Sequence, residues 1–509
     1  MKSNQINQLK MGALLSYLQM ILQCIVSLVY TPIMIQALGD SEYGVYSLAI
    51  SVTSYLSLLN FGFGSAYIRY YSKYKSINDI EKIQQLNGMF LSIFIIFGVI
   101  VLIIGGILLL GIKCFFARSM NEQEVQLIRI LMMFMIVNMA ISFLDSVFTS
   151  FVTAHEKFIF QKVLNMLKTV ATPISVIVVL KVGGKSIPVV MVTTVYVVIA
   201  AIINVIYCKK KLHIHFSFGK FDFELLKEMA SFSLFIAVNN LIDQINWNVD
   251  KVILGKVKGA VAVAIYSTAS QINSLVMQIS TSISNVFVPR VNRLVVEKKR
   301  EELLELFIKV GRIQFIFLSL VISGYIFFGK YFIQNIYAKE SYVEAYYIGL
   351  FLIIPALIPL VQNLGIEIQR AMYVHKFRAY IYLFMAIINI LISIPLANAY
   401  SGIGCAIGTA VSLLVANGVL MNWYYYKKMK IDIFKFWKEI FSIFSGLIVP
   451  GIVGVFINLF VEYYNVWMYF GTIVFYGCVF ACSIWKYGLN NFEKNLFLGI
   501  YLRMRGVKK

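Results

Sequence analysis

The residues of this chain best suited to bind a cation or a hydroxyl-rich ligand lie on one face of a long apolar segment. In SFSLFIAVNNLIDQINWNVDKVILG, residues 231–255, four polar residues follow one another at spacings of 4, 3 and 4: Asn239, Asp243, Asn246 and Asp250. A helix brings positions three and four apart onto the same face. Carboxylates can hold H⁺ or Na⁺, and amides can replace the water around a hydroxyl-rich ligand.

Two other apolar segments repeat this pattern. The segment at 11–37 carries Gln23, Ser27 and Tyr30 at spacings of 4 and 3. The segment at 259–288 carries Gln271, Ser274, Gln278, Thr281 and Asn285 on one face. A charged group at mid-bilayer costs at least about 2.5–3.5 kcal/mol, so it faces a cavity, water or a partner. The alternative to a hydrated cavity is that these polar side chains form hydrogen bonds between neighbouring helices and stabilise their packing. The expected cavity lining comprises Gln23, Ser27, Tyr30, Asn239, Asp243, Asn246, Asp250, Gln271, Ser274, Gln278 and Asn285.

The elements that must position these residues are membrane-length helices. Hydrophobic residues make up 60% of the 509 and charged residues only 14%, too few for the surface of a soluble protein. A helix needs roughly 20 apolar residues to cross a bilayer. The sequence predicts an all-α polytopic membrane protein of about 14 transmembrane helices, at 11–37, 44–68, 86–112, 125–152, 163–181, 186–207, 229–254, 259–288, 306–329, 344–366, 378–398, 402–426, 439–460 and 467–487.

The basic residues are distributed unevenly about these spans. When the loops alternate between the two sides, 34 of the 45 lysines and arginines fall on the side of the termini. The positive-inside rule therefore predicts cytoplasmic termini. The net charge of +21 then faces anionic lipid rather than nucleic acid.

No motif for catalysis or for a cofactor accompanies the spans. The longest polar segments have only about 17–20 residues, too few to fold a domain alone. There is no phosphate-binding Gly-rich loop ahead of a lysine, and the six cysteines and four histidines have no metal-ligand spacing. We therefore expect neither an enzyme nor a bound metal or cofactor.

A short internal repeat links the first and seventh spans. Leu38-Gly39 matches Leu254-Gly255, and Tyr46-Ser47 matches Tyr266-Ser267 with four extra residues in the second loop. Six spans separate the copies, an even number, so both copies have the same orientation in the bilayer. This is a parallel repeat, a common transporter design.

Three stretches also carry a family resemblance: TPIMIQALGDSEYGVYSLA, LLNFGFGSAYIRYYSKY and NWNVDKVILGKVKGAVAVAIYSTA. The chain resembles the Wzx-type oligosaccharide/polysaccharide flippases, the polysaccharide transporter branch of the multidrug/oligosaccharidyl-lipid/polysaccharide exporter superfamily. The resemblance implies two pseudo-symmetric six-helix lobes around a central cavity, residues 1–207 and 229–426. A cytoplasmic linker, 208–228, joins them, and 427–509 supply two extra helices and a basic tail.

The resemblance also implies a function. Members of the family move an undecaprenyl-diphosphate-linked oligosaccharide across the bacterial plasma membrane without ATP, beside glycan assembly enzymes of capsule or cell-wall synthesis. The candidates for binding the diphosphate are Arg69, Arg290 and Arg370, with snorkelling anchors as the alternative. Family members often carry cations deep in the cavity, where this chain has Asp243 and Asp250. We expect these two acids to couple transport to H⁺ or Na⁺.

Two further charges lie at similar depth on adjacent spans, Asp145 and Lys168. A structural ion pair is favoured over a role in transport, since a buried pair is costly to break. Three alternatives for the whole chain share some of its features. A drug/cation antiporter of the same superfamily or a lipid II flippase would have the same fold. A membrane polysaccharide polymerase or ligase would need a larger outer loop than the dozen or so residues near 113–124.

Overall fold

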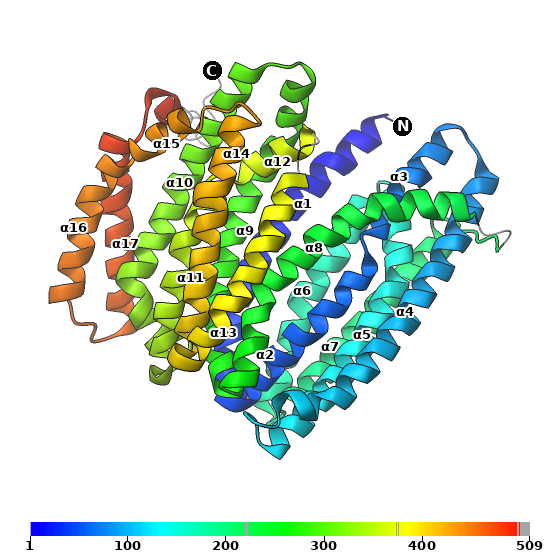
Figure 1. Ribbon diagram of the computed structural model, residues 1–509, viewed down its shortest axis with the longest axis horizontal. Helices are drawn as coiled ribbons and strands as arrows, with labels where there is room; N and C mark the ends of the chain where they lie inside the picture. The colour runs from blue at the N-terminus through cyan, green and yellow to red at the C-terminus, as the bar shows by residue number, and fades with distance from the viewer. Residues whose placement is uncertain (1, 219–221, 373, 375, 496–497, 499–509) are drawn as a thin grey trace. The chain divides into compact units, whose positions relative to one another are not determined.

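The computed structural model describes residues 2–218, 222–372, 374, 376–495 and 498 (Figure 1). Within these ranges it leaves out the side chains of 2–10, 12–14, 231–232, 234–236, 239 and 243. The described chain is built from helices and turns, with no strand among its residues. It divides into two compact units, 1–268 with 390–405, and 269–389 with 406–509.

The first unit contains the helices of the N-terminal half. They are α1 (Lys2–Leu38), α2 (Asp40–Ser54), η1 (Tyr55–Asn60), α3 (Phe63–Ser76), α4 (Ile80–Phe116), α5 (Glu122–Ala154), α6 (Phe158–Lys181), α7 (Ser186–Lys210), α8 (Phe223–Val257) and the start of α9 (Ala260–Val296). Figure 1 shows α4, α5 and α7 running alongside one another, and α4 packs on α5 as α5 packs on α7.

The second unit begins within α9 and contains most of the remaining elements. They are α10 (Arg300–Tyr331), η2 (Phe332–Tyr337), η3 (Glu340–Tyr342), α11 (Val343–Val361), α12 (Asn363–Ala371), α13 (Lys376–Leu413), η4 (Leu414–Met421), α14 (Asn422–Lys427), α15 (Ile433–Phe441), α16 (Phe444–Phe460), α17 (Val466–Ser483) and η5 (Ile484–Gly488). The segment 390–405 of α13 belongs to the first unit.

Twelve helices of the described chain are long and apolar enough to cross a membrane. One of them, Lys376–Lys427, has 52 residues and contains a break at Tyr400 and Ser401, whose φ is +52°. Each arm of that helix is long enough to span the bilayer. Helix α8 has 35 residues, which is also long enough to cross a bilayer. With α8 and the second arm included, the helices of membrane-spanning length match the predicted fourteen.

The second span is less regular than the sequence predicts. We expected one continuous helix over 44–68, but α2 ends at Ser54 and a 3₁₀ segment follows. Phe61 and Gly62 then adopt left-handed φ values of 48° and 72°, and the chain resumes as α3 at Phe63. The left-handed region is strongly disfavoured for a bulky residue such as Phe61, so the packing around this break must hold it in place.

The turn between α1 and α2 is fixed by hydrogen bonds to the N-termini of α5 and α7 within the first unit. The Glu42 carboxylate accepts hydrogen bonds from the backbone N–H of Ser186 (2.7 Å) and from its hydroxyl (2.6 Å), at the first residue of α7. The Ser41 hydroxyl donates to Glu124, which forms a capping box with Asn121 at the start of α5. Carboxylates at helix N-termini satisfy unpaired N–H groups and favour the helix dipole. Glu42 therefore has a structural role.

The two copies of the repeat contact each other within the first unit. Gly44 lies so close to Ala260 that a Cβ on Gly44 would overlap the Ala260 carbonyl oxygen. A Cβ on Gly255 would come 2.7 Å from the side chain of Leu48, itself fully buried. The Ser119 hydroxyl donates to the carbonyl of Gly255 at 2.6 Å. Glycine is required at such close approaches because it has no Cβ.

The boundary between the compact units falls within α9, after Thr268, rather than in the linker at 208–228. The predicted lobes, 1–207 and 229–426, group residues by their place in the repeat, whereas the compact units group them by packing. The predicted tail helices lie in the second unit, where Phe328 of α10 forms an aromatic cluster with Tyr469 and Tyr476 of α17.

Candidate functional site

Asp250 is a carboxylate buried in the first unit near the end of α8, with 2% of its side chain exposed. The hydroxyl of Tyr266, on α9, donates to its Oδ2 at 2.5 Å. The thiol of Cys405 lies 4.0 Å from the Asp250 carbonyl, and the hydroxyl of Ser393 donates to the Cys405 carbonyl at 3.5 Å. The carboxylate of Asp250 thus accepts a hydrogen bond from α9, while its backbone carbonyl lies next to the segment of α13 that belongs to the same unit.

A second polar cluster of the first unit joins α2 to α8. The Gln244 side-chain oxygen accepts from the hydroxyl of Ser54 (3.0 Å) and from the amide of Asn248 (2.6 Å). These contacts were not predicted, because the predicted face of this helix carries Asn239, Asp243, Asn246 and Asp250 instead. Gln244 and Asn248 are also four apart, so a search for every i, i+4 polar pair would have found them.

The remaining predicted residues of the first unit have mixed surroundings. The side chains of Asn239 and Asp243 lie outside the described residues. On α1, Gln23 is exposed while Ser27 and Tyr30 are partly buried, and Asn246 on α8 is also partly buried.

The predicted stripe on α9 lies in the second unit and is largely accessible. Ser274 and Asn285 are exposed, and Gln271 and Gln278 are partly buried. The hydroxyl of Ser274 donates to the carbonyl of Ser270 at 2.9 Å. Such bonding within the helix reduces the cost of an exposed hydroxyl in a membrane.

The opposite face of α9 carries a buried polar cluster that the sequence argument missed. The Gln314 amide, on α10, donates to the hydroxyl of Ser284 (2.7 Å) and to the carbonyl of Ser280 (3.1 Å). The Ser280 hydroxyl donates to the carbonyl of Leu360 on α11 at 2.7 Å. This cluster is interhelical hydrogen bonding of the kind that holds membrane helices together.

The three arginines proposed to bind the diphosphate have exposed side chains. Arg69 lies on α3 of the first unit, and Arg290 and Arg370 lie on α9 and α12 of the second. Arg370 already forms an ion pair with Glu367, at 2.7 Å. Binding of a phosphate by Arg370 would therefore compete with that carboxylate.

Asp145 takes its hydrogen bonds from a residue other than the predicted partner. Both of its oxygens accept from the amide of Asn204 on α7, at 2.9 and 3.1 Å. Lys168 on α6 acts on Asp145 electrostatically, although no ion pair within 4.0 Å joins these two described residues. Among the described residues, no group of three or more His, Cys, Asp or Glu side chains could hold a metal ion.

Comparison with known proteins agrees with this architecture. Residues 9–295 match the model of a family described as polysaccharide biosynthesis protein. No curated protein sequence matches the chain.

Several solved structures resemble the chain over most of its length, all at low identity. A lipid II flippase, MurJ, in an inward closed conformation has a TM-score of 0.71 at 15% identity, covering 93% of this chain and 97% of its own. An inward-facing multidrug resistance MATE family transporter has a TM-score of 0.65 at 15% identity over 82% and 95%. A MOP superfamily transporter from Pyrococcus furiosus has a TM-score of 0.59 at 14% identity over 85% and 96%.

Proposed function

Because the chain belongs to the polysaccharide biosynthesis protein family, we propose that it flips an undecaprenyl-diphosphate-linked oligosaccharide between the leaflets of a bacterial plasma membrane. The chain is a membrane transporter of the superfamily that contains MurJ and the MATE transporters. Within that superfamily we propose that it is a Wzx-type flippase, which works by alternating access. The observation that carries this proposal is the family match over residues 9–295 of a chain built from membrane-length helices.

The polar residues exposed on membrane-length helices support a sugar as the cargo. Gln23 on α1 and Ser274 and Asn285 on α9 are exposed. Sugar hydroxyls lose their hydrogen bonds to water when they enter hydrocarbon. Amide and hydroxyl side chains along the path replace those bonds and let the sugar cross.

The diphosphate requires cations, and the basic residues of the chain lie mostly on one side of the membrane. Arg69, Arg290 and Arg370 are the candidates and all three are exposed, but Arg370 must first leave Glu367. The same bias in basic residues supports cytoplasmic termini. The lipid-linked sugar then enters where the cations are, at the cytoplasmic leaflet.

Asp250 is our candidate for coupling transport to an ion gradient, together with Asp243. Its carboxylate is buried and accepts a hydrogen bond from Tyr266. A buried carboxylate costs most when it is charged and unneutralised, so H⁺ or Na⁺ would bind there with a large gain. Release of that ion on the other side of the membrane would favour the return of the empty transporter.

A deletion strain tests the substrate. The lipid-linked pool, extracted and analysed by mass spectrometry, should show an undecaprenyl-diphosphate oligosaccharide that accumulates on the cytoplasmic side. An unchanged pool would contradict the proposal. Asp250→Asn, expressed in the same strain, should restore transport poorly and without dependence on the gradient, whereas full gradient-dependent transport by this variant would exclude Asp250 as the coupling group.

A drug/cation antiporter of the same superfamily is the second candidate. The buried carboxylate of Asp250 favours it, because a cationic drug could exchange for H⁺ or Na⁺ at such a group. That function predicts increased sensitivity of the deletion strain to lipophilic cations with no change in the lipid-linked pool. The two measurements on one strain therefore separate the two functions.

A further inference from the structure

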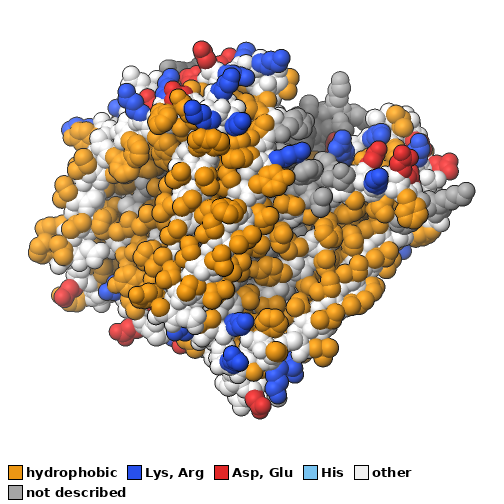
Figure 2. All heavy atoms as spheres, viewed as in Figure 1, with side chains coloured by type: hydrophobic (Ala, Val, Ile, Leu, Met, Phe, Trp, Pro, Cys, Tyr) orange, Lys and Arg blue, Asp and Glu red, His pale blue; other side chains and the backbone are white. Residues whose placement is uncertain are grey.

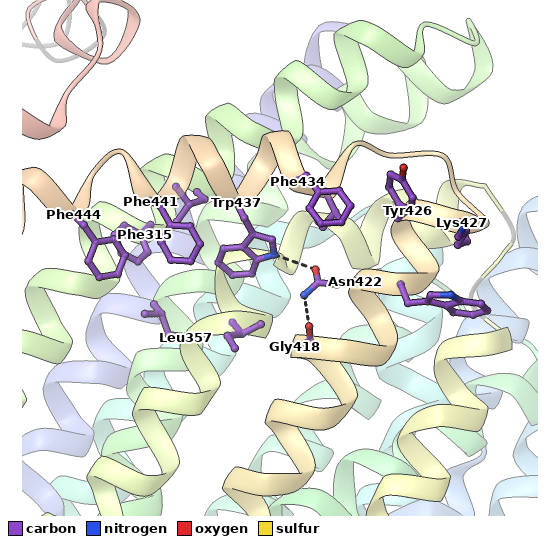
Figure 3. A pocket seen from close by; sticks show the side chains of 14 residues that line it. Phe315, Leu357, Gly418, Asn422, Tyr426, Lys427, Phe434, Trp437, Phe441 and Phe444 are labelled. Atoms are coloured by element: carbon purple, nitrogen blue, oxygen red, sulfur yellow. Dashed lines mark hydrogen bonds between the residues drawn. The ribbon is translucent and has the colours of Figure 1, made fainter.

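The second unit contains an apolar groove of about 790 Å³ beneath the short helix α15 (Figure 3). Its walls come from α10, α11, the η4–α14 segment, α15 and the start of α16. Phe315, Leu357, Phe434, Phe441 and Phe444 contribute aromatic and aliphatic surface. The volume falls within the roughly 300–1,000 Å³ of pockets that bind small molecules.

Helix α15 has a wider apolar face than its docking requires. Ile433, Phe436 and Ile440 are buried and fix the helix to its unit, with Phe436 stacked on Phe307 of α10 at 4.4 Å between ring centroids. A second apolar stripe follows one residue later, at 434, 437 and 441, and lines the groove. Phe434 is 70% exposed and Phe441 is 58% exposed. Phe434 contacts Tyr426 and Phe441 contacts Phe444, at 5.2 and 5.5 Å between ring centroids, yet more than half of each side chain stays open to an apolar ligand.

The polar atoms at the base of the groove are already used. Asn422 accepts from the indole N–H of Trp437 (3.2 Å) and from the amide of Gln362 (2.6 Å). Its own amide donates to the carbonyls of Gly418 (2.8 Å) and Asn417 (3.1 Å), which a π-helical turn leaves free. Figure 3 shows Trp437 held against Asn422 in this way. A ligand inside the groove would find no free amide group there, so the interior suits a hydrocarbon chain.

Charge gathers at one end of the groove. Lys427 lines its mouth, and Lys428, Lys430, Lys435 and Lys438 are exposed on the same stretch of chain. The acids of this stretch are engaged, since Asp432 caps α15 and Glu439 lies 3.5 Å from Arg312. Exposed Trp423 and Tyr426 lie beside Lys427. Aromatic side chains next to lysines at the ends of spans mark the interface between hydrocarbon and head groups.

We propose that this groove binds an anionic phospholipid of the surrounding leaflet, with an acyl chain between α15 and α11 and the phosphate at Lys427. The apolar stripe at 434, 437 and 441 would contact the chain. The lysines from 427 to 438 would select an anionic head group over a zwitterionic one. This site lies within one unit and does not depend on what the protein transports.

Tryptophan fluorescence tests the proposal on the full-length protein in lipid vesicles. The probe is phosphatidylglycerol with brominated acyl chains, compared with brominated phosphatidylcholine at the same mole fraction. Bromine quenches an indole on contact, and Trp437 and Trp423 line the groove. We expect stronger quenching by the anionic lipid. Trp437→Phe should remove most of the excess, which assigns the signal to the groove.

Two variants separate the acyl-chain site from the head-group site. Gly418→Phe should fill the groove, since a Cβ there meets only Ile358, at an ordinary 3.6 Å, and it should reduce quenching by both lipids. Gly471→Phe, where nothing lies within 4 Å, is the matched control and should leave quenching unchanged. Lys427→Gln, at an exposed position that does not endanger folding, should lower the preference for the anionic lipid about fivefold, and Lys427→Arg should retain it.

Three results would overturn the proposal. Equal quenching by the two brominated lipids would show that charge does not select the occupant. Quenching unaffected by Gly418→Phe would show that the acyl chains contact tryptophans elsewhere. No quenching of Trp437 by either lipid, with a dimer in cross-linking, would show that a second copy of the chain covers the groove.

Discussion

The guanidinium of Arg312 and the carboxylate of Glu493 form a buried bidentate pair in the second unit, with Nε 2.6 Å from Oε1 and Nη2 3.0 Å from Oε2. The remaining donors of Arg312 reach the carbonyls of Glu439 and Gly488 and the hydroxyl of Ser442. One side chain of α10 therefore joins the stretches of chain that contain α15, η5 and the residues after η5. Its burial and these partners give Arg312 a structural role in the second unit.

Arg312→Ala should lower the free energy of unfolding by about 3–5 kcal/mol, because it leaves the Glu493 carboxylate buried without its partner. Thermal unfolding of the purified protein in detergent measures the change. Lys299→Ala is the matched control, because Lys299 pairs with Glu302 at 3.2 Å on the exposed surface, and such pairs contribute about 0–1 kcal/mol. Equal unfolding midpoints for the two variants would contradict this structural role of Arg312.

Gly44 and Gly106 provide a matched pair of helical glycines in the first unit. Gly44→Ala should destabilise the protein by about 1–3 kcal/mol, since the new Cβ would overlap the Ala260 carbonyl and force the two copies of the repeat apart. Gly106→Ala has no atom within 4 Å of its Cβ and should be neutral or stabilising by up to about 1 kcal/mol. Gly44→Ala should therefore lower the unfolding midpoint, whereas Gly106→Ala should leave it unchanged or raise it.

His155 should make the protein less stable in acid. Its Nδ1–H donates to the carbonyl of Phe151, which leaves Nε2 to accept from the Tyr71 hydroxyl at 2.9 Å. Burial lowers the pKa of His155 below its ordinary value of 6.5, as do the charges of Lys75 and Lys157, although the Phe151 carbonyl raises it. A group whose folded-state pKa is depressed contributes stability that is fully present above its unfolded-state pKa and is lost as the pH falls through the folded-state pKa.

Unfolding midpoints measured from pH 7.5 down to pH 5 should therefore fall as the pH drops through about 6.5 and below. In His155→Gln this part of the decline should disappear, while declines caused by carboxylates at lower pH remain. An unchanged slope in the variant would show that His155 titrates no differently in the two states.

Asp145 and Lys168 should be coupled energetically through space even though Asp145 takes its hydrogen bonds from Asn204. Asp145→Leu and Lys168→Met should each destabilise the protein. The double variant should lose less than the sum of the two, because an uncompensated charge in the membrane costs at least about 2.5 kcal/mol. A coupling energy of zero in this cycle would show that Asn204 alone stabilises the carboxylate.

The sequence predicted the helices well because apolar length is a strong signal in a membrane protein. The break at Phe61 and Gly62 could not be predicted, since the apolar run continues through it and nothing local demands a left-handed phenylalanine. The site was predicted less well. Spacing identifies the residues that share a face, as on α9, but it cannot say whether that face or the one with Ser280 and Ser284 meets Gln314 of a neighbouring helix.

The segment 390–405 completes the first unit although more than a hundred residues of the second unit are synthesised before it. Cys405 follows its contact with Asp250 by 155 positions. At about 5–20 residues per second, a ribosome takes roughly 8–30 s to cover that distance. During biogenesis the side of α8 that carries Asp250 is therefore already in the membrane before the segment 390–405, which packs against it, has been translated. An insertase or chaperone that shields this incomplete helix would act within that interval.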